Sequence, residues 1–93
     1  MEAEQIEKIL KEIKGEYYIS PFYQEETVKG YIKEAEQSIK NNVSDFVDFD
    51  TDLQARSLLK NYVKYALENL KDEFEIRYAK DYTELQINYA TKH

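Results

Sequence analysis

The residues that most readily interrupt a helix are confined to the first third of this chain. They are Gly15, Pro21 and Gly30, and no glycine or proline follows them. Because these two residue types are the least favourable in a helix interior, the later two thirds of the chain can form long helices. With 93 residues, the chain is long enough for one domain and too short for two. The sequence therefore predicts a single all-α domain over residues 1–93, a small bundle of about four helices.

Apolar residues at helical spacing locate three helices in the first seventy residues or so. The first is expected at about Ala3 to Lys14, ending at Gly15, and the second at about Glu25 to Asn41. A third is expected to begin at Thr51, because Gln54 follows at the spacing of a capping box. Its apolar stripe is expected to form the core with Ile32 and Ile39 of the second helix, and consists of Leu58, Leu59, Tyr62, Val63, Ala66, Leu67 and Leu70, with Lys60, Lys64, Glu68 and Lys71 outside.

The segment between the first two predicted helices is rich in aromatic residues. Four of the seven residues from Tyr17 to Tyr23 are aromatic, and they surround the only proline without helical spacing. Exposure of so much apolar surface is unusual in a monomer. We therefore expect an ordered connection after the first helix that packs over the core or contacts a partner.

Apolar residues continue beyond Leu70 at helical spacing, as Phe74, Tyr78, Tyr82, Leu85 and Tyr89. A step of four residues overshoots a full helical turn by about 40°, so the apolar stripe rotates by about 240° between Leu58 and Tyr82. A straight helix could not keep this stripe on one core. Either the chain bends near Lys71 and Asp72, or a long helix leaves the core. Because one small core cannot easily receive both apolar stripes, we expect a C-terminal helix, at about residues 72–90, to be a docking element.

Residues suited to catalysis or cofactor binding are scarce. The chain has no cysteine, and its only histidine is the C-terminal His93. Gly15 and Gly30 are too far apart to form a phosphate-binding loop. Carboxylate pairs such as Asp72 and Glu73 are explained by their solvation on a helix surface, so they do not indicate acid–base catalysis. We therefore expect a protein that is not an enzyme and takes no cofactor.

Three alternating aspartates resemble the start of a calcium-binding loop. They are Asp48, Asp50 and Asp52. Such a loop also needs a turn glycine and a distal glutamate, and Leu53 and Leu59 occupy those two positions. We therefore expect no metal site here, only an acidic loop before a helix.

Charge and aromatic content favour contact with proteins. The 13 basic and 19 acidic residues give a net charge of −6, which disfavours binding to nucleic-acid phosphates.

No apolar run is long enough for a secretion signal or a membrane span, so cytosolic synthesis is expected. Nine tyrosines suit protein interfaces. The candidate partner-binding residues are Phe74, Tyr78, Tyr82, Leu85 and Tyr89 of the last helix and Tyr18, Phe22 and Tyr23 of the aromatic connection.

Two segments resemble the head-to-tail connector (adaptor) proteins of tailed bacteriophages. Residues 50–89, DTDLQARSLLKNYVKYALENLKDEFEIRYAKDYTELQINY, are similar to the family's acidic helix start and its leucine- and tyrosine-rich helix. Residues 28–43, VKGYIKEAEQSIKNNV, are similar to its second helix. Two features depart from the family pattern: Asn41 and Asn42 replace the usual loop glycine, and the aromatic connection around Pro21 matches no family motif. The resemblance covers about two thirds of the chain and is carried by common helical patterns.

This resemblance implies a structural protein of the virion neck that assembles in the host cytoplasm. Such connectors form a ring of about twelve copies under the portal protein and join it to a stopper or tail protein. DNA passes through the axial channel without specific binding, which an acidic wall favours. A ring of this kind needs two different adhesive surfaces on each subunit.

Two other functions remain open from the sequence. One is a small acidic inhibitor that mimics DNA, which would present a face dense in carboxylates. Lysines interrupt nearly every acidic run, however, apart from Asp45 to Asp52. The other is a helical regulator that binds a single protein partner.

Overall fold

Helices account for the regular structure of this chain. The computed structural model describes residues 1–17 and 19–92, and within them there are helices and no strands. The helices are α1 (Ala3–Glu16), α2 (Glu25–Asn42), α3 (Leu53–Leu67), α4 (Lys71–Arg77) and α5 (Ala79–Lys92). The predicted all-α class is confirmed, and the described residues form five helices where about four were expected.

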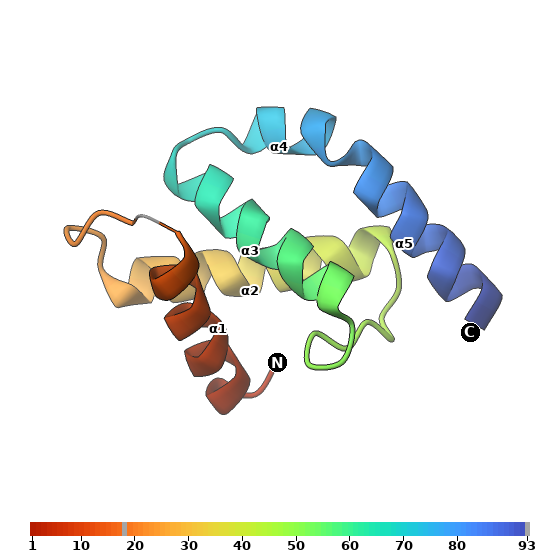
Figure 1. Cartoon of the computed structure of the whole chain (residues 1–93), viewed down its shortest axis with the longest axis horizontal. Coiled ribbons are helices and arrows are strands. Elements are labelled where there is room, and N and C mark those ends of the chain that lie inside the picture. Colours follow the sequence, from red (N-terminus) through yellow and green to blue (C-terminus); the bar gives the residue numbers. More distant parts are fainter. Residues whose placement is uncertain (18, 93) are drawn as a thin grey trace.

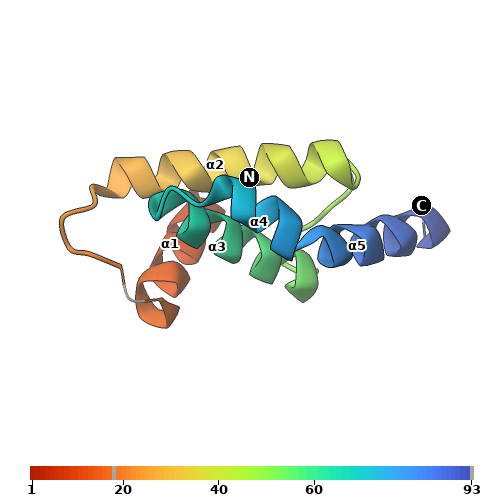
Figure 2. The same cartoon turned by 90° about the horizontal axis from the view of Figure 1, so that it is seen from above.

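The helices pack around a central pair, α2 and α3 (Figure 1). The contact between α2 and α3 is the most extensive of any two helices, and α1 packs mainly on α2. Helix α4 contacts α3, and α5 touches both α2 and α3. The domain is flat, with extents of 42 × 29 × 19 Å, and Figure 2 shows α2 as a layer over the other helices. Residues 19–24, which lead into α2, and the C-terminal end of α5 lie at opposite ends of the long axis.

The core consists of the apolar faces that helical spacing predicted. The fully buried side chains include Ile9 and Ile13 from α1, Ile32 and Ile39 from α2, and Leu59 and Val63 from α3. The other members of the stripe are buried as well, except its last residue, Leu70, which is only partly buried. The expected core is therefore confirmed apart from Leu70. Burial of each large aliphatic side chain stabilises a fold by about 1.5–3 kcal/mol. The three helices therefore share one core.

Two predicted helix ends are wrong. Helix α1 runs through Gly15 and ends where Tyr17 adopts an extended backbone, with φ −116° and ψ 147°. Thr51 does not cap α3: the carboxylate of Asp52 accepts a hydrogen bond from the Ala55 backbone N–H at 3.0 Å. An aspartate is at least as good a cap as a threonine, and here it adds negative charge at the helix N-terminus.

The chain bends between α3 and α4, which is the first of the two expected alternatives. Asn69 has a left-handed backbone with φ 59°, and the N–H of Leu70 donates to the Tyr65 carbonyl at 2.8 Å. This is the geometry of a helix end at which asparagine can replace glycine. The bend falls just before the expected position at Lys71 and Asp72.

A second irregularity at Tyr78 separates α4 from α5 and raises the helix number to five. The helical hydrogen bonds across it persist, from Tyr78 N–H to the Phe74 carbonyl at 2.9 Å and from Tyr82 N–H to the Tyr78 carbonyl at 3.1 Å. In Figure 1 the chain turns here, so that α4 lies above α3 and α5 runs down the right-hand side. No described helix is long and apolar enough to cross a membrane.

These two bends place the C-terminal apolar residues on the same core. Phe74 and Leu85 are 1% and 0% exposed, and Tyr78, Tyr82 and Tyr89 pack half-buried against the core. The premise that one small core could not receive both apolar stripes is therefore wrong. Bending the chain turns the rotated stripe back toward α2 and α3, which a straight helix could not do.

Candidate protein-binding surfaces

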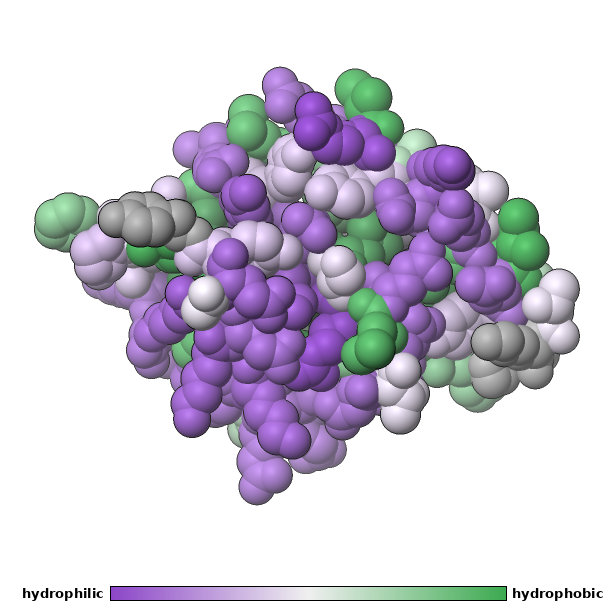
Figure 3. Space-filling view, viewed as in Figure 1, coloured by the Kyte–Doolittle hydropathy of each residue, from purple (hydrophilic) through white to green (hydrophobic). Residues whose placement is uncertain are grey.

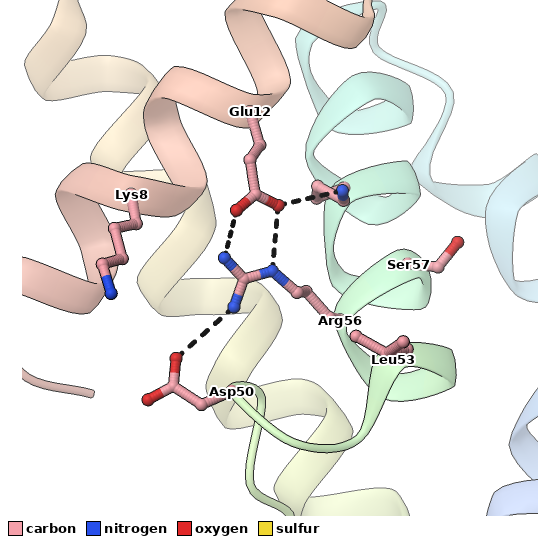
Figure 4. A pocket seen from close by; sticks show the side chains of 7 residues that line it. Lys8, Glu12, Asp50, Leu53, Arg56 and Ser57 are labelled. Carbon is pink, nitrogen blue, oxygen red and sulfur yellow. Dashed lines mark hydrogen bonds and ion pairs between the residues drawn. The ribbon is translucent and has the colours of Figure 1, made fainter.

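An open groove lies between α1 and the start of α3 (Figure 4). Its volume is about 600 Å³. The residues that line it are Lys8, Glu12, Asp50, Leu53, Arg56, Ser57 and Lys60. Lys8 and Glu12 come from α1, one helical turn apart, and Arg56 and Lys60 come from successive turns of α3. The groove therefore joins two helices that are distant in the sequence.

Ion pairs form the floor of this groove. The Arg56 guanidinium donates to both carboxylate oxygens of Glu12, through Nε at 2.9 Å and through Nη2, and its Nη1 donates to the Phe49 carbonyl at 3.0 Å. Lys60 Nζ donates to Glu12 at 3.1 Å and to Glu16 at 2.8 Å. Lys60 was expected outside the core but is 9% exposed, because these pairs compensate its burial.

The charges in the floor reinforce one another. Hydrogen bonds from Arg56, and then from Lys60, hold the pKa of the Glu12 carboxyl at about 2 against the opposing effect of burial. The hydrogen bond to Glu12 raises the pKa of Arg56. Burial lowers the pKa of Lys60, but its bonds to Glu16 and Glu12 outweigh burial and raise it. All three groups stay charged near neutral pH and fasten α1 to α3.

The rim of the groove differs from its floor. Leu53 is 73% exposed, and Lys8 and Ser57 are exposed as well. Among the described residues, neither the Lys8 ammonium nor the Ser57 hydroxyl has a hydrogen-bond or ion-pair partner. In Figure 4 no dashed line reaches either side chain. The rim thus offers a cation, a hydroxyl and an apolar group to another molecule, while the floor has its own partners.

The three alternating aspartates have separate partners. Asp48 accepts the Asp50 N–H at 2.9 Å, and Asp50 lies 3.4 Å from Arg56 Nη1. Asp52 caps α3 and accepts the Tyr89 hydroxyl at 2.7 Å. The described residues contain no group of three or more acidic, histidine or cysteine side chains placed to hold a metal ion.

The candidate partner-binding residues differ in exposure. Phe22 is 92% exposed, whereas the Tyr23 hydroxyl anchors the aromatic connection by donating to the Leu67 carbonyl at 2.6 Å. Tyr18 lies outside the described residues. Phe74 and Leu85 are too buried to touch a partner, unlike the half-buried Tyr78, Tyr82 and Tyr89.

Aromatic contacts tie the tyrosines of the C-terminal region to the core. Phe74 stacks on Tyr78 with ring centroids 4.7 Å apart and meets the edges of Tyr62 and Tyr82 at 5.2 and 6.2 Å. Burial and the bond to Asp52 raise the pKa of Tyr89 to about 12. These rings therefore hold α4 and α5 in place, whatever else they contact.

Exposed apolar side chains that sequence reasoning missed lie elsewhere. They are Phe46 at 71%, Leu53 at 73%, Ile76 at 81% and Ile87 at 58% exposure. Positions 76 and 87 fall off the stripe that contains Phe74 and Leu85, and this offset is the signal that could have revealed them. Apolar residues form separate patches in Figure 3, at the edges of the face and near its middle, so no single large patch dominates it.

Known proteins offer no guide to which of these surfaces matters. Neither the protein-family models, nor the curated proteins, nor the solved structures include a match to this chain. A function has to be inferred from the chain's own surfaces.

Proposed function

We propose that this chain is a structural protein of the virion neck, a head-to-tail connector that forms a ring under the portal of a tailed bacteriophage. The observation that carries the proposal is the exposed apolar surface left at two ends of a domain whose core is already complete. Phe22, 92% exposed, belongs to residues 19–24 at one end of the long axis, and Ile87, 58% exposed, belongs to α5, which reaches the other end. A subunit that joins two different neighbours needs such separate surfaces.

The C-terminal helix, about residues 72–90, is the docking element of this proposal. Since Phe74 and Leu85 belong to the core, its contact with the portal falls to the outer side of α5 around Ile87, with Tyr78, Tyr82 and Tyr89 at the margin. The aromatic connection, with Phe22 and Tyr23, is then the surface for the stopper or tail protein. Large apolar anchors surrounded by polar side chains are typical of protein interfaces.

The acidic character of the chain suits this role. A net charge of −6 repels DNA phosphates, so an acidic channel wall lets DNA pass without adhering. The proposal includes no catalysis and no cofactor.

The alternative of an acidic DNA mimic has less support. Such a protein needs free carboxylates at regular spacing, but Glu12 and Glu16 are paired with Arg56 or Lys60. Glu34 and Glu36 also have cationic partners. A helical regulator that binds one partner would use the same exposed side chains, and stoichiometry separates it from a connector.

The proposal can be tested with purified portal protein from the genome that encodes this chain. We expect the wild-type chain to sediment with the portal as a ring visible by electron microscopy. Ile87→Ser should abolish co-sedimentation, because a polar side chain removes the apolar anchor from α5. Phe46→Ser is the matched control, since it makes a similar change at an exposed residue outside both surfaces.

Two outcomes would contradict the connector. One is that the wild-type chain fails to bind the portal. The other is that it binds as a single copy, which would favour the regulator.

A further inference from the structure

We propose that a second copy of this chain docks the outer face of its α4 on the rim of the groove between α1 and α3, so that copies join head to tail. The α4 outer face is made of Asp72, Glu73 and Ile76, and the groove rim is made of Lys8, Leu53 and Ser57. The inference deepens the proposed function, because it rests on the idea of a ring and assigns the two surfaces by which its subunits meet.

The groove rim is incomplete within one chain. Leu53 occupies the first helical position of α3 yet is 73% exposed, so it adds little to the core. Lys8 is exposed and has no partner among the described residues, whereas Glu12 and Asp50 in the floor are neutralised by Arg56 and Lys60. An occupant that brings an apolar side chain and a carboxylate would satisfy both Leu53 and Lys8.

The α4 outer face offers that chemistry. Ile76 is 81% exposed, and Asp72 and Glu73 are exposed in the first turn of α4. Glu73 precedes Ile76 by three residues and Asp72 precedes it by four, so all three share one side of the helix. Neither carboxylate has an ion-pair partner among the described residues. Docking would place the apolar Ile76 against the apolar Leu53. It would also place the negative Glu73 against the positive Lys8.

The two surfaces lie on different sides of the molecule. In Figure 1, α4 lies above α3 while α1 lies below it, so a chain cannot dock its own α4 in its own groove. A contact between two different patches is heterologous, and its repetition gives a closed ring or an open filament.

This contact should be weak and sensitive to salt. Helix α4 has seven residues, a length of about 10 Å, so the buried area falls below the roughly 1,200 Å² of stable interfaces. Lys8 also lines a smaller hollow with Glu2 and Glu4, which lowers the local positive potential. Exposed charge pairs are screened at high ionic strength. We therefore expect self-association only in concentrated protein at low salt.

Paired charge reversals test the assignment on the full chain. Sedimentation velocity at about 1 mM protein should show oligomers at about 0.05 M salt that dissociate at about 1 M. Lys8→Glu and Glu73→Lys should each weaken association about tenfold, because each places like charges at the contact. In an equimolar mixture, the reversed groove of the Lys8→Glu chain can pair with the reversed α4 face of the Glu73→Lys chain. The intact groove and the intact α4 face of the two variants pair as in the wild type, so the mixture should recover wild-type association.

The matched control is Lys33→Glu, which makes the same charge change at an exposed α2 lysine outside both surfaces and should leave association unchanged. Far-UV circular dichroism checks that every variant is folded. The assignment is overturned if the wild-type chain stays monomeric at low salt, or if the mixture associates no better than either variant alone. If the mixture recovers association but the wild-type chain does not bind the portal, the contact between copies stands and the connector proposal is wrong.

Discussion

Helices α1 and α5 both pack on the α2–α3 pair, but different contacts hold them. Helix α1 buries four aliphatic side chains, Ile6, Ile9, Leu10 and Ile13, and pairs Glu12 with Arg56 and Lys60. Helix α5 buries only Leu85 fully and relies on half-buried tyrosines. Its hydrogen bonds include Gln86 to the Asn42 carbonyl at 2.7 Å and Tyr89 to Asp52 at 2.7 Å, and no ion pair joins its described side chains to the rest of the chain.

The comparison shows that α1 buries more apolar side chains than α5 and is also held by ion pairs, which α5 lacks among its described side chains. Local stability follows the apolar area that an element buries, so α5 should open more readily than α1. The helix proposed to dock on a partner is therefore the one whose displacement costs least. Helix α1, by contrast, responds to acid and salt through its charges, while α5 responds to alkali through Tyr89.

The largest loss of stability is expected from a substitution in the core that α1 and α5 both contact. Leu59 is fully buried at the centre of α3, so Leu59→Asp places an unpaired charge in the common core. We expect α1 and α5 to unfold together, with loss of the helical circular dichroism signal at room temperature. Leu53→Asp, at an exposed position on the same helix, is the control and should remain folded. A Leu59→Asp protein that melts within about two degrees of the parent would place the core elsewhere.

A smaller effect, concentrated in the C-terminal region, is expected from Phe74→Ala. This ring is 1% exposed and contacts Tyr62, Tyr65, Tyr78 and Tyr82, so its removal should lower the free energy of unfolding by about 3–5 kcal/mol. Urea unfolding measures this loss of free energy. Ile76→Ala, two positions away and exposed, should change stability by less than about 0.5 kcal/mol. Equal losses from the two substitutions would show that α4 does not face the core.

The burial of Phe74 and Leu85 also determines what truncation should do. Cutting the chain after Lys71 removes Phe74 and Leu85, so the remaining three helices lose part of their core. We expect that fragment to be strongly destabilised and not to fold as an independent domain. Point substitutions on the outer side of α5 are therefore the sharper test of docking.

The acid response should belong to α1. The pKa of Glu12 is lowered from its ordinary 4.5 to about 2, so the stability it contributes is full above pH 4.5 and is lost as the pH falls toward 2. Glu12→Gln should cost about 1–2 kcal/mol at neutral pH, given that the Glu12 side chain is partly exposed. It should also flatten the pH dependence of urea unfolding in that window. Glu4→Gln, at an exposed α1 position, should do neither.

The smallest effect is the alkaline response of α5. The pKa of Tyr89 is raised from 10 to about 12, so its contribution is full below pH 10 and is lost as the pH rises toward 12. Tyr89→Phe removes the bond to Asp52 and should cost about 1 kcal/mol. Amide hydrogen exchange should show faster opening in α5 and unchanged protection in α1. Tyr31→Phe serves as the control, and equal exchange changes in both helices would remove the distinction between the two regions.

Sequence reasoning located the core more accurately than the surfaces. Ile32, Ile39, Leu59 and Val63 could be identified because helical spacing alone tells which side of a helix is apolar. Ile76 was missed because its only signal is its offset from the stripe of Phe74 and Leu85, and helical periodicity identifies stripes, not single residues outside them. Lys60 was placed outside because its burial depends on Glu12 and Glu16, more than forty residues away in the chain.

Local sequence determined that this chain is helical and which faces of α1, α2 and α3 are apolar, because those properties depend on neighbours within a few residues. Only the tertiary structure decided where the C-terminal stripe goes. The left-handed backbone at Asn69 and the turn at Tyr78 return Phe74 and Leu85 to the core, and burial there outweighs the cost of bending. The same folding leaves Ile76 and Ile87 outside, since one side of a helix cannot face the core when the opposite side does.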